Sequence, residues 1–312
     1  MQTTITNSVK IAAEFIKKGE VTAFPTETVY GIGANAYDEK AVKKIFKAKG
    51  RPTDNPLIVH VALKKDIGVL ASDITPSAKK IIKAFFPGPV TVILKKNEIV
   101  PDIVTASLDT IAIRMPASKI ARELIKLSGV PIAAPSANLS GSPSPTNFIH
   151  VLRDLRNKIP CVLVGPSARY GLESTVIDCT GKHPVILRPG SITLEQLKKI
   201  DKNTSYKKKA GKIKSPGQKY RHYAPKAKVR LMKRETSNVK RETMGYIGFN
   251  KKMANHFEIV KICNSLEDYA KNLFSFFREC DEKGIKTIYC DKINEKGIGL
   301  AIMNRLIKAS TK

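Results

Sequence analysis

Residues 130–138 read VPIAAPSAN, an apolar run that ends in the hydroxyl of Ser136 and the amide of Asn138. A short apolar run bounded by glycine and proline is typical of a buried β-strand. Helix-like segments, with apolar residues three and four positions apart, lie before it at 118–128 and after it at 146–157. Strands and helices that interleave in this way predict an α/β domain, here with polar groups at the end of a strand.

The same alternation continues through the first 200 residues. Strand-like runs occur at 21–24, 57–62, 90–94, 110–115, 131–134, 161–164, 175–179 and 185–187. Helix-like runs occur at 39–48, 77–86, 118–128, 146–157 and 193–200. Because some strands follow one another with no helix between them, we expect a mixed, twisted sheet with flanking helices.

A second, smaller α/β unit follows a polar segment that is rich in glycine and proline. Its predicted strands are 229–232, 244–249 and 286–290, and its predicted helices are 266–280 and 299–309. We therefore predict a domain over 1–201, a basic linker over 202–228, and a Rossmann-like C-terminal α/β domain over 229–312.

Composition limits the class of protein. With 312 residues and 42% hydrophobic content, the chain can build two domains with ordinary cores. The five cysteines are scattered and include no C-x-x-C pair, which argues against a disulfide framework or a zinc site and favours a reducing compartment. No apolar run approaches the roughly 20 residues of a membrane span. We expect a soluble, cytoplasmic protein.

The net charge of +28 predicts a polyanionic partner, either nucleotide phosphates or RNA. The charge is uneven, because positions 202–234 hold thirteen Lys or Arg and no acidic residue. A block of this kind is typical of a solvated segment, which fits the predicted linker.

Two glycine-rich signals for nucleotide binding fail on inspection. No G-x-x-x-x-G-K-[ST] sequence is present, so ATP would have to be held without a P-loop. The stretch GIGANA at 31–36 resembles a dinucleotide fingerprint, but six residues separate it from the preceding strand where a tight turn is required. We do not expect NAD binding.

A second polar cluster reads KGRPTDNP over 49–56. A helix end explains Lys49 and Gly50, since lysine and glycine are common at helix C-termini. It does not explain Arg51 and Asn55, which stand on a proline-stiffened loop and could offer a guanidinium and an amide to a ligand.

Further candidates lie near strand ends. Thr28 follows the first strand, Ser174 starts another, and His60 lies within a strand, where a structural role is the more common one. Arg114 ends an apolar strand and must find an anion, either a ligand carboxylate or a protein group such as Glu123.

Together these clusters resemble the threonylcarbamoyl-AMP synthase family, in its long form with a YrdC-like domain, a linker and a C-terminal domain. The resemblance is carried by segments 24–33, 49–60, 113–115, 134–144, 174–175 and 187–190 and by YRHYAP at 220–225. Its signature is the pair of elements Lys-x-Arg and Ser-x-Asn, present here as Lys49/Arg51 and Ser136/Asn138.

The resemblance implies an enzyme that joins L-threonine, bicarbonate and ATP into threonylcarbamoyl-AMP and releases pyrophosphate. A tRNA threonylcarbamoyl transferase complex would then modify the adenosine next to the anticodon. It implies catalytic roles for Lys49 and Arg51, with Mg²⁺ held by the phosphates and not by the protein. The implied ATP-side residues are Arg51, Asn55, Thr110, Ala134, Ser136, Asn138, Ser144, Arg188 and Tyr223, with Tyr223 as a lid. The implied threonine-side residues are Thr28, His60, Arg114, Ser136 and Ser174.

Two other functions stay open at this stage. One is a double-stranded RNA- or tRNA-binding module without catalysis, which the charge favours but which needs no apolar-walled pocket. The other is carbamoyl transfer in metalloenzyme maturation, which uses a related domain; the paired-cysteine motifs of that group are missing from this sequence.

Overall fold

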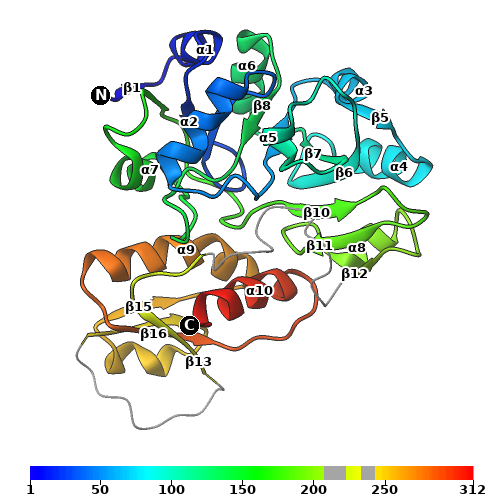
Figure 1. Cartoon of the computed structure of the whole chain (residues 1–312). Helices are drawn as coiled ribbons and strands as arrows, with labels where there is room; N and C mark the ends of the chain where they lie inside the picture. The colour runs from blue at the N-terminus through cyan, green and yellow to red at the C-terminus, as the bar shows by residue number, and fades with distance from the viewer. Residues whose placement is uncertain (207–222, 233–242, 312) are drawn as a thin grey trace.

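The computed structural model describes residues 1–206, 223–232 and 243–311, which form two β-sheets with their helices (Figure 1). Residues 207–222, which make up most of the predicted linker, lie outside the described residues. Within that predicted segment, Ser205 and Tyr206 form a short strand that extends the larger sheet.

The larger sheet holds the first twelve strands, in the order β1-β9-β2-β3-β8-β4-β7-β6-β10-β11-β12, with β5 paired to β6. The strands are β1 (Thr4–Thr6), β2 (Thr22–Phe24), β3 (Gly31–Asn35), β4 (Ile58–His60), β5 (Ala71–Asp73), β6 (Val90–Lys96), β7 (Thr110–Arg114), β8 (Ile132–Ala134), β9 (Cys161–Leu163), β10 (Thr175–Asp178), β11 (Val185–Arg188) and β12 (Ser205–Tyr206). Parallel and antiparallel pairs both occur, so the predicted mixed sheet is confirmed.

Helices flank this sheet, and the predicted helices at 39–48, 77–86, 118–128, 146–157 and 193–200 are all present, whereas the short helices at 67–70 and 102–105 were not predicted. They are α1 (Val9–Lys17), α2 (Glu39–Lys49), α3 (Ile67–Leu70), α4 (Pro76–Phe85), α5 (Asp102–Thr105), α6 (Lys119–Ser128), α7 (Phe148–Leu155) and α8 (Leu194–Lys198), with the 3₁₀ turn η1 (Lys64–Asp66). Helix α2 begins at Asp38, whose side chain accepts from the Ala41 amide, and ends at Gly50 in the left-handed region. Lys49 lies four residues after Ile45 on the buried face, so the helix directs it inward.

The glycine-rich stretch that mimics a dinucleotide fingerprint is β3, a strand between β2 and β8. A Cβ atom on Gly33 would lie 2.3 Å from the Cγ2 atom of Ile132, so glycine is required for the close approach of β8. The stretch therefore continues as a strand and does not form a strand-to-helix turn.

The smaller sheet is wholly parallel, in the order β13-β16-β14-β15. Its elements are β13 (Lys228–Met232), β14 (Met244–Gly248), the 3₁₀ helix η2 (Lys251–His256), β15 (Ile259–Ile262), α9 (Leu266–Glu282), β16 (Thr287–Asp291) and α10 (Ile298–Ser310). Helices α9 and α10 lie between this sheet and the larger unit (Figure 1). Val29, Leu172 and Tyr223 join their apolar core, so the two units share a packed interface.

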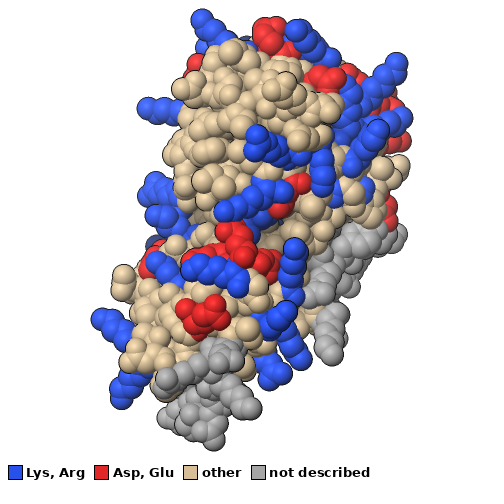
Figure 2. All heavy atoms as spheres, turned by 90° about the vertical axis from the view of Figure 1, so that its left-hand side faces the viewer, with Lys and Arg blue, Asp and Glu red and all other residues tan. Residues whose placement is uncertain are grey.

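Positive side chains are spread widely over the surface. Figure 2 shows Lys and Arg on both units of one face, with Asp and Glu interspersed and no single basic stripe on that face. Among the described residues, no helix is both long and apolar enough to cross a membrane.

Candidate active site

A pocket opens where several strands of the larger sheet end, and most of the predicted site residues line it. It is lined by Thr26, Thr28, Val29, Gly31, Arg51, Ile58, His60, Arg114, Ala134, Pro135, Ser136, Glu173, Ser174, Arg188 and Tyr223. The strand register explains part of the convergence, because the parallel pairing of β4 and β7 places Arg114 beside His60. Strand β8 runs antiparallel to β4, so Ala134 pairs with Ile58 and the residues after Ala134 approach the pocket from the other end of β4.

Five predicted residues do not line the pocket: Lys49, Asn55, Thr110, Asn138 and Ser144. Thr110 starts β7, at the opposite end of that strand from Arg114. Asn55 is buried, and neither its Oδ1 nor its Nδ2 atom has a hydrogen-bond partner in the structure. A buried amide without partners is costly unless a ligand satisfies it.

Arg114 has a protein carboxylate as its partner, and that carboxylate is Glu27. Its Nη2 atom donates to Glu27 Oε1 at 2.6 Å, and its Nη1 atom donates to Thr28 Oγ1 at 2.9 Å. The suggested partner Glu123 is therefore wrong. Burial works to raise the pKa of Glu27, but the charge of Arg114 and hydrogen bonds from Arg114 and the backbone together outweigh it, so the pKa lies below its ordinary value. The pair fixes Thr28 at the pocket wall.

Ser174, another residue of the pocket lining, is held by Thr91 and Arg188. The hydroxyls of Ser174 and Thr91 are 2.8 Å apart, and Arg188 Nη2 donates to the Ser174 carbonyl at 3.0 Å. Both Arg188 and Ser174 are buried, so their positions are fixed before a ligand binds.

His60 is neutral at physiological pH. Burial, together with the nearby charge of Arg114, lowers its pKa from 6.5 to about 3. Its Nδ1 atom lies 3.2 Å from the Ile58 carbonyl, and its ring meets Phe24 edge to face. It therefore shapes the pocket and is unsuited to accept a proton.

Tyr223 closes the pocket from the side of the second unit. Its hydroxyl is hydrogen-bonded to Arg188, its ring stacks on Phe274 at 5.4 Å, and the Arg305 guanidinium lies 5.2 Å from the ring centroid. Tyr223 adopts a φ of 69°, which a non-glycine residue takes only under constraint.

Glu173 is a site residue that sequence reasoning missed. Its Oε2 atom accepts from Arg305 Nε at 2.9 Å, and its Oε1 atom accepts from the Ser144 hydroxyl. Burial works to raise its pKa, but Arg305 and Arg188 lower it by more, so the carboxyl stays ionised. The one available signal was an acidic residue directly before a buried strand; its partner lies 132 positions away.

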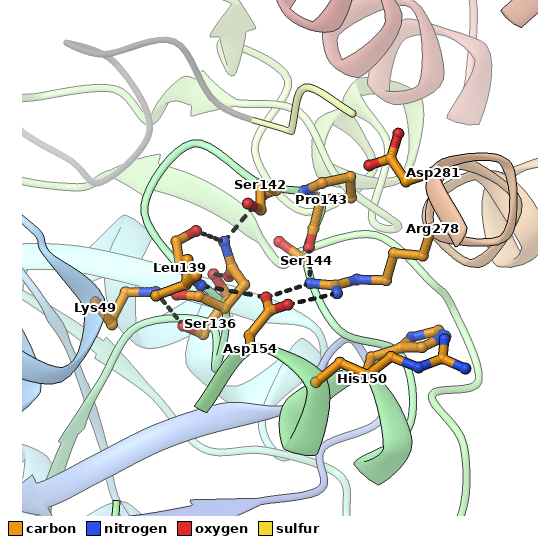
Figure 3. A network of polar contacts seen from close by, with 12 residues as sticks. Lys49, Ser136, Leu139, Ser142, Pro143, Ser144, His150, Asp154, Arg278 and Asp281 are labelled. Atoms are coloured by element: carbon orange, nitrogen blue, oxygen red, sulfur yellow. Dashed lines mark hydrogen bonds and ion pairs between the residues drawn. The ribbon is translucent and has the colours of Figure 1, made fainter. Parts of the chain in front are cut away.

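Lys49 is directed at the backbone of the loop that follows β8. Its Nζ atom donates to the Ser136 carbonyl at 2.6 Å and also to the Asn138 carbonyl (Figure 3). Burial, with the charge of Arg51, lowers the pKa of Lys49 well below its ordinary value. Lys49 thus fixes the backbone of the Ser-x-Asn element through these two hydrogen bonds.

The donor set does not suit a protein-held metal. Within the described ranges, no three His, Cys, Asp or Glu side chains are grouped as metal ligands. Of the described residues that line the pocket, Glu173 alone carries a carboxylate, and it is paired with Arg305.

Comparison with known proteins gives the family. Residues 14–190 match the Sua5/YciO/YrdC family, described as telomere recombination, and residues 192–311 match the threonylcarbamoyl-AMP synthase C-terminal domain. The chain belongs to the Sua5 family of threonylcarbamoyl-AMP synthases.

Relatives cover nearly the whole chain. The threonylcarbamoyl-AMP synthase of Pyrococcus abyssi is 47% identical over 97% of this chain and 94% of its own, and that of Bacillus subtilis is 42% identical over 98% and 94%. The structure of Pyrococcus abyssi Sua5 in complex with L-threonine superposes with a TM-score of 0.91 at 45% identity, covering 99% of this chain and 98% of that one.

The Sua5-type assignment confirms the predicted fold and activity. This chain is a threonylcarbamoyl-AMP synthase, an ATP-using transferase of tRNA threonylcarbamoyladenosine modification. A nucleic-acid-binding module without catalysis, the alternative left open by the sequence, is thereby excluded.

Proposed function

We propose that the pocket binds L-threonine, bicarbonate and ATP together and forms threonylcarbamoyl-AMP there. The observation that carries this proposal is the convergence of three guanidinium groups, those of Arg51, Arg114 and Arg188, on one lining that includes the hydroxyls of Thr28 and Ser136. The one acid on that lining, Glu173, is paired with Arg305. The excess positive charge suits a polyphosphate and an amino-acid carboxylate.

We assign the site residues to the two substrates in two groups, which include the five residues outside the pocket lining. Arg51, Asn55, Thr110, Ala134, Ser136, Asn138, Ser144, Arg188 and Tyr223 make the ATP side, with Lys49 behind it. Thr28, His60, Arg114, Ser136 and Ser174 make the threonine side. Asn55 supports this division, since its buried amide has unused donors and an unused acceptor that a nucleotide can satisfy.

The chemistry requires little from acid–base groups. The threonine amine combines with bicarbonate to give a carbamate and water. A carbamate oxygen then attacks the α-phosphorus of ATP, and the bond to the pyrophosphate oxygen breaks. Because the carbamate is already anionic, the residues around it need only position the reactants and neutralise charge, and the neutral His60 is consistent with this.

Mg²⁺ enters as part of the substrate, bound to the phosphates of ATP. This accords with the lining, on which Glu173 is already engaged by Arg305.

The five cysteines are free and buried, which supports a cytoplasmic enzyme. We further propose that its product passes to a tRNA threonylcarbamoyl transferase complex, and that the net charge of +28 allows direct contact with tRNA. Residues 1–201 would form the catalytic domain, 202–228 the linker and lid, and 229–312 the C-terminal domain.

The test is pyrophosphate release from ATP with and without threonine and bicarbonate, with serine as the competing amino acid. We expect release to require both co-substrates and to prefer threonine. Release that is indifferent to threonine would contradict the assignment of the pocket.

A further inference from the structure

The 136–144 loop, which follows β8, carries three of the residues proposed for the ATP side: Ser136, Asn138 and Ser144. Lys49 holds its first residues from the side of α2. The amide of Asn138 then folds the loop on itself, donating to the Leu139 carbonyl at 2.7 Å and the Ser142 carbonyl at 2.9 Å.

The outer side of this loop is fixed by the second unit. Arg278 on α9 donates through Nη2 to the Pro143 carbonyl at 2.5 Å (Figure 3). The same guanidinium forms two hydrogen bonds to Asp154 on α7, at 3.0 and 2.7 Å. Asp154 in turn accepts from the Leu139 amide at 3.2 Å. A third contact comes from the Ala224 amide, which donates to the Gly141 carbonyl at 3.0 Å.

This arrangement makes the loop geometry dependent on α9. The side chains of Arg278 and Asp154 are 8% and 13% exposed, so their two-pronged ion pair is shielded from water. Without the guanidinium, Asp154 keeps a buried charge that, among the described residues, only the Leu139 amide then hydrogen-bonds, and the Pro143 carbonyl loses its donor. The least costly response is for the loop to shift.

We propose that Arg278 is a positioning residue for nucleotide binding, which sets the 136–144 loop through Asp154 and Pro143. The inference rests on the proposed function, which places this loop on the ATP side. It gives the C-terminal unit a defined task in the reaction, since a residue 135 positions away from Pro143 shapes the wall that ATP meets. By linkage, bound ATP stabilises the docking of α9 to the same extent.

The chain offers a matched control for this proposal. Arg153 on α7 forms an ion pair with Glu282 on α9, across the same interface, and both side chains are partly exposed. In the described part of the chain, the polar contacts that hold the 136–144 loop include those of Asp154, Arg278, Lys49 and Ala224 and do not include this pair. Replacing Arg153 therefore perturbs the joint between the units without disturbing the loop.

The experiment compares the full-length variants Arg278→Met, Arg278→Lys and Arg153→Met in steady-state pyrophosphate release. We expect Arg278→Met to raise the KM for ATP at least tenfold and the KM for threonine less than twofold. Arg278→Lys keeps the charge but not the planar fork, so its effect should be intermediate. Arg153→Met should match the unmodified enzyme.

A second readout is hydrogen exchange of the Leu139 amide in the ligand-free protein. It should accelerate in Arg278→Lys and stay unchanged in Arg153→Met. An unchanged KM for ATP in both Arg278 variants would overturn the inference, as would equal effects of the Arg278 and Arg153 variants. If Arg51→Ala also left the KM for ATP unchanged, the proposed function itself would have failed, so the two failures can be told apart.

Discussion

Arg305 of α10 donates through Nε to Glu173 Oε2 at 2.9 Å, and both side chains are almost completely shielded from solvent. This ion pair joins the two units directly beside the pocket, because Glu173 lines it and also accepts from Ser144. The surrounding cations and hydrogen bonds outweigh the effect of burial and keep the pKa of the carboxyl below its ordinary value, so a charged pair connects the sheet to the C-terminal helix.

Removing one charge of this buried ion pair should be strongly destabilising. Glu173→Gln leaves the buried Arg305 without its counter-charge, and we expect the free energy of unfolding to fall by about 3–5 kcal/mol. The double variant Glu173→Gln/Arg305→Met removes both charges and should lose less than the sum of the two single variants. Urea unfolding of the four proteins measures the coupling. Lys283→Met, which breaks an exposed pair with Glu279, should leave the midpoint unchanged. Strictly additive effects would contradict a buried, coupled pair.

Two substitutions of Tyr223 separate the contribution of its hydroxyl to the proposed lid from that of its ring. Tyr223→Phe loses the hydrogen bond to Arg188 but keeps the stack on Phe274. Tyr223→Ala also removes the ring that closes the pocket, and should admit water to a hydrolysable intermediate. We expect Tyr223→Ala to form clearly less threonylcarbamoyl-AMP per pyrophosphate released, with a rise in the KM for ATP of about tenfold or more. Tyr223→Phe should keep the product ratio of the unmodified enzyme. Identical ratios of threonylcarbamoyl-AMP to pyrophosphate in all three proteins would contradict the lid role of Tyr223.

Replacing Asn55 should increase the stability of the ligand-free protein and weaken the binding of ATP. Its buried amide has no hydrogen-bond partner on either polar atom, so Asn55→Leu removes a desolvation penalty at nearly constant shape. The free energy of unfolding of the ligand-free protein should rise by about 1 kcal/mol, while ATP affinity falls. Asn138→Leu is the control, because that amide bonds Leu139 and Ser142, and its loss should destabilise the protein. A destabilised Asn55→Leu protein with normal ATP affinity would show that the amide serves the fold alone.

Arg51 is the cation for which we expect the largest loss of activity. Arg51→Ala should lower the kcat/KM for threonine-dependent pyrophosphate release by about 100-fold or more, with little change in thermal stability. Arg51 Nη2 also donates to the carbonyls of Asn55 and Pro56, so Arg51→Lys helps to separate charge from loop support. The control is Lys47→Ala, an exposed cation on the same helix end, which should have no effect. Normal turnover in Arg51→Ala would remove Arg51 from the site.

The sequence predicts elements whose signal is local. Apolar runs and helical periodicity located most of the strands and long helices, because burial on one face dictates both patterns. Strand β3 escaped, since its glycines carry no strand propensity and are explained by the close approach of Ile132. Strand β15 escaped as well, because Lys261 interrupts its short apolar run.

The same distinction holds for the site: residues with a local signal in the sequence could be predicted, and residues without one could not. Polar residues at strand ends, such as Ser136 and Arg114, could be singled out because each stands at the end of an apolar run, and the structure places both on the pocket lining. Glu27, Glu173 and Arg278 could not be found, since their partners lie roughly 90–130 positions away and no local pattern encodes the pairing. The inward direction of the Lys49 side chain could have been predicted, because Lys49 continues the buried face of α2 after Ile45.

His60 makes the stability of the protein sensitive to acid. Its pKa is about 3 in the folded protein, because of burial and the charge of Arg114, and 6.5 as an ordinary value. Between these values the unfolded chain binds more protons than the folded one, so the free energy of unfolding decreases as the pH falls below 6.5 and continues to decrease until about pH 3.

Replacing this histidine should therefore flatten the pH dependence. Between pH 7 and pH 5 we expect the unmodified protein to lose about 2 kcal/mol more of its free energy of unfolding than His60→Gln. His150, whose pKa is about 4, is common to both proteins and cancels in the comparison. Exposed His183 supplies the control: His183→Gln should follow the unmodified protein. Parallel curves for His60→Gln and the unmodified protein would mean that the buried imidazole can take up a proton within the folded state, and the argument for a neutral group in the pocket would then fail.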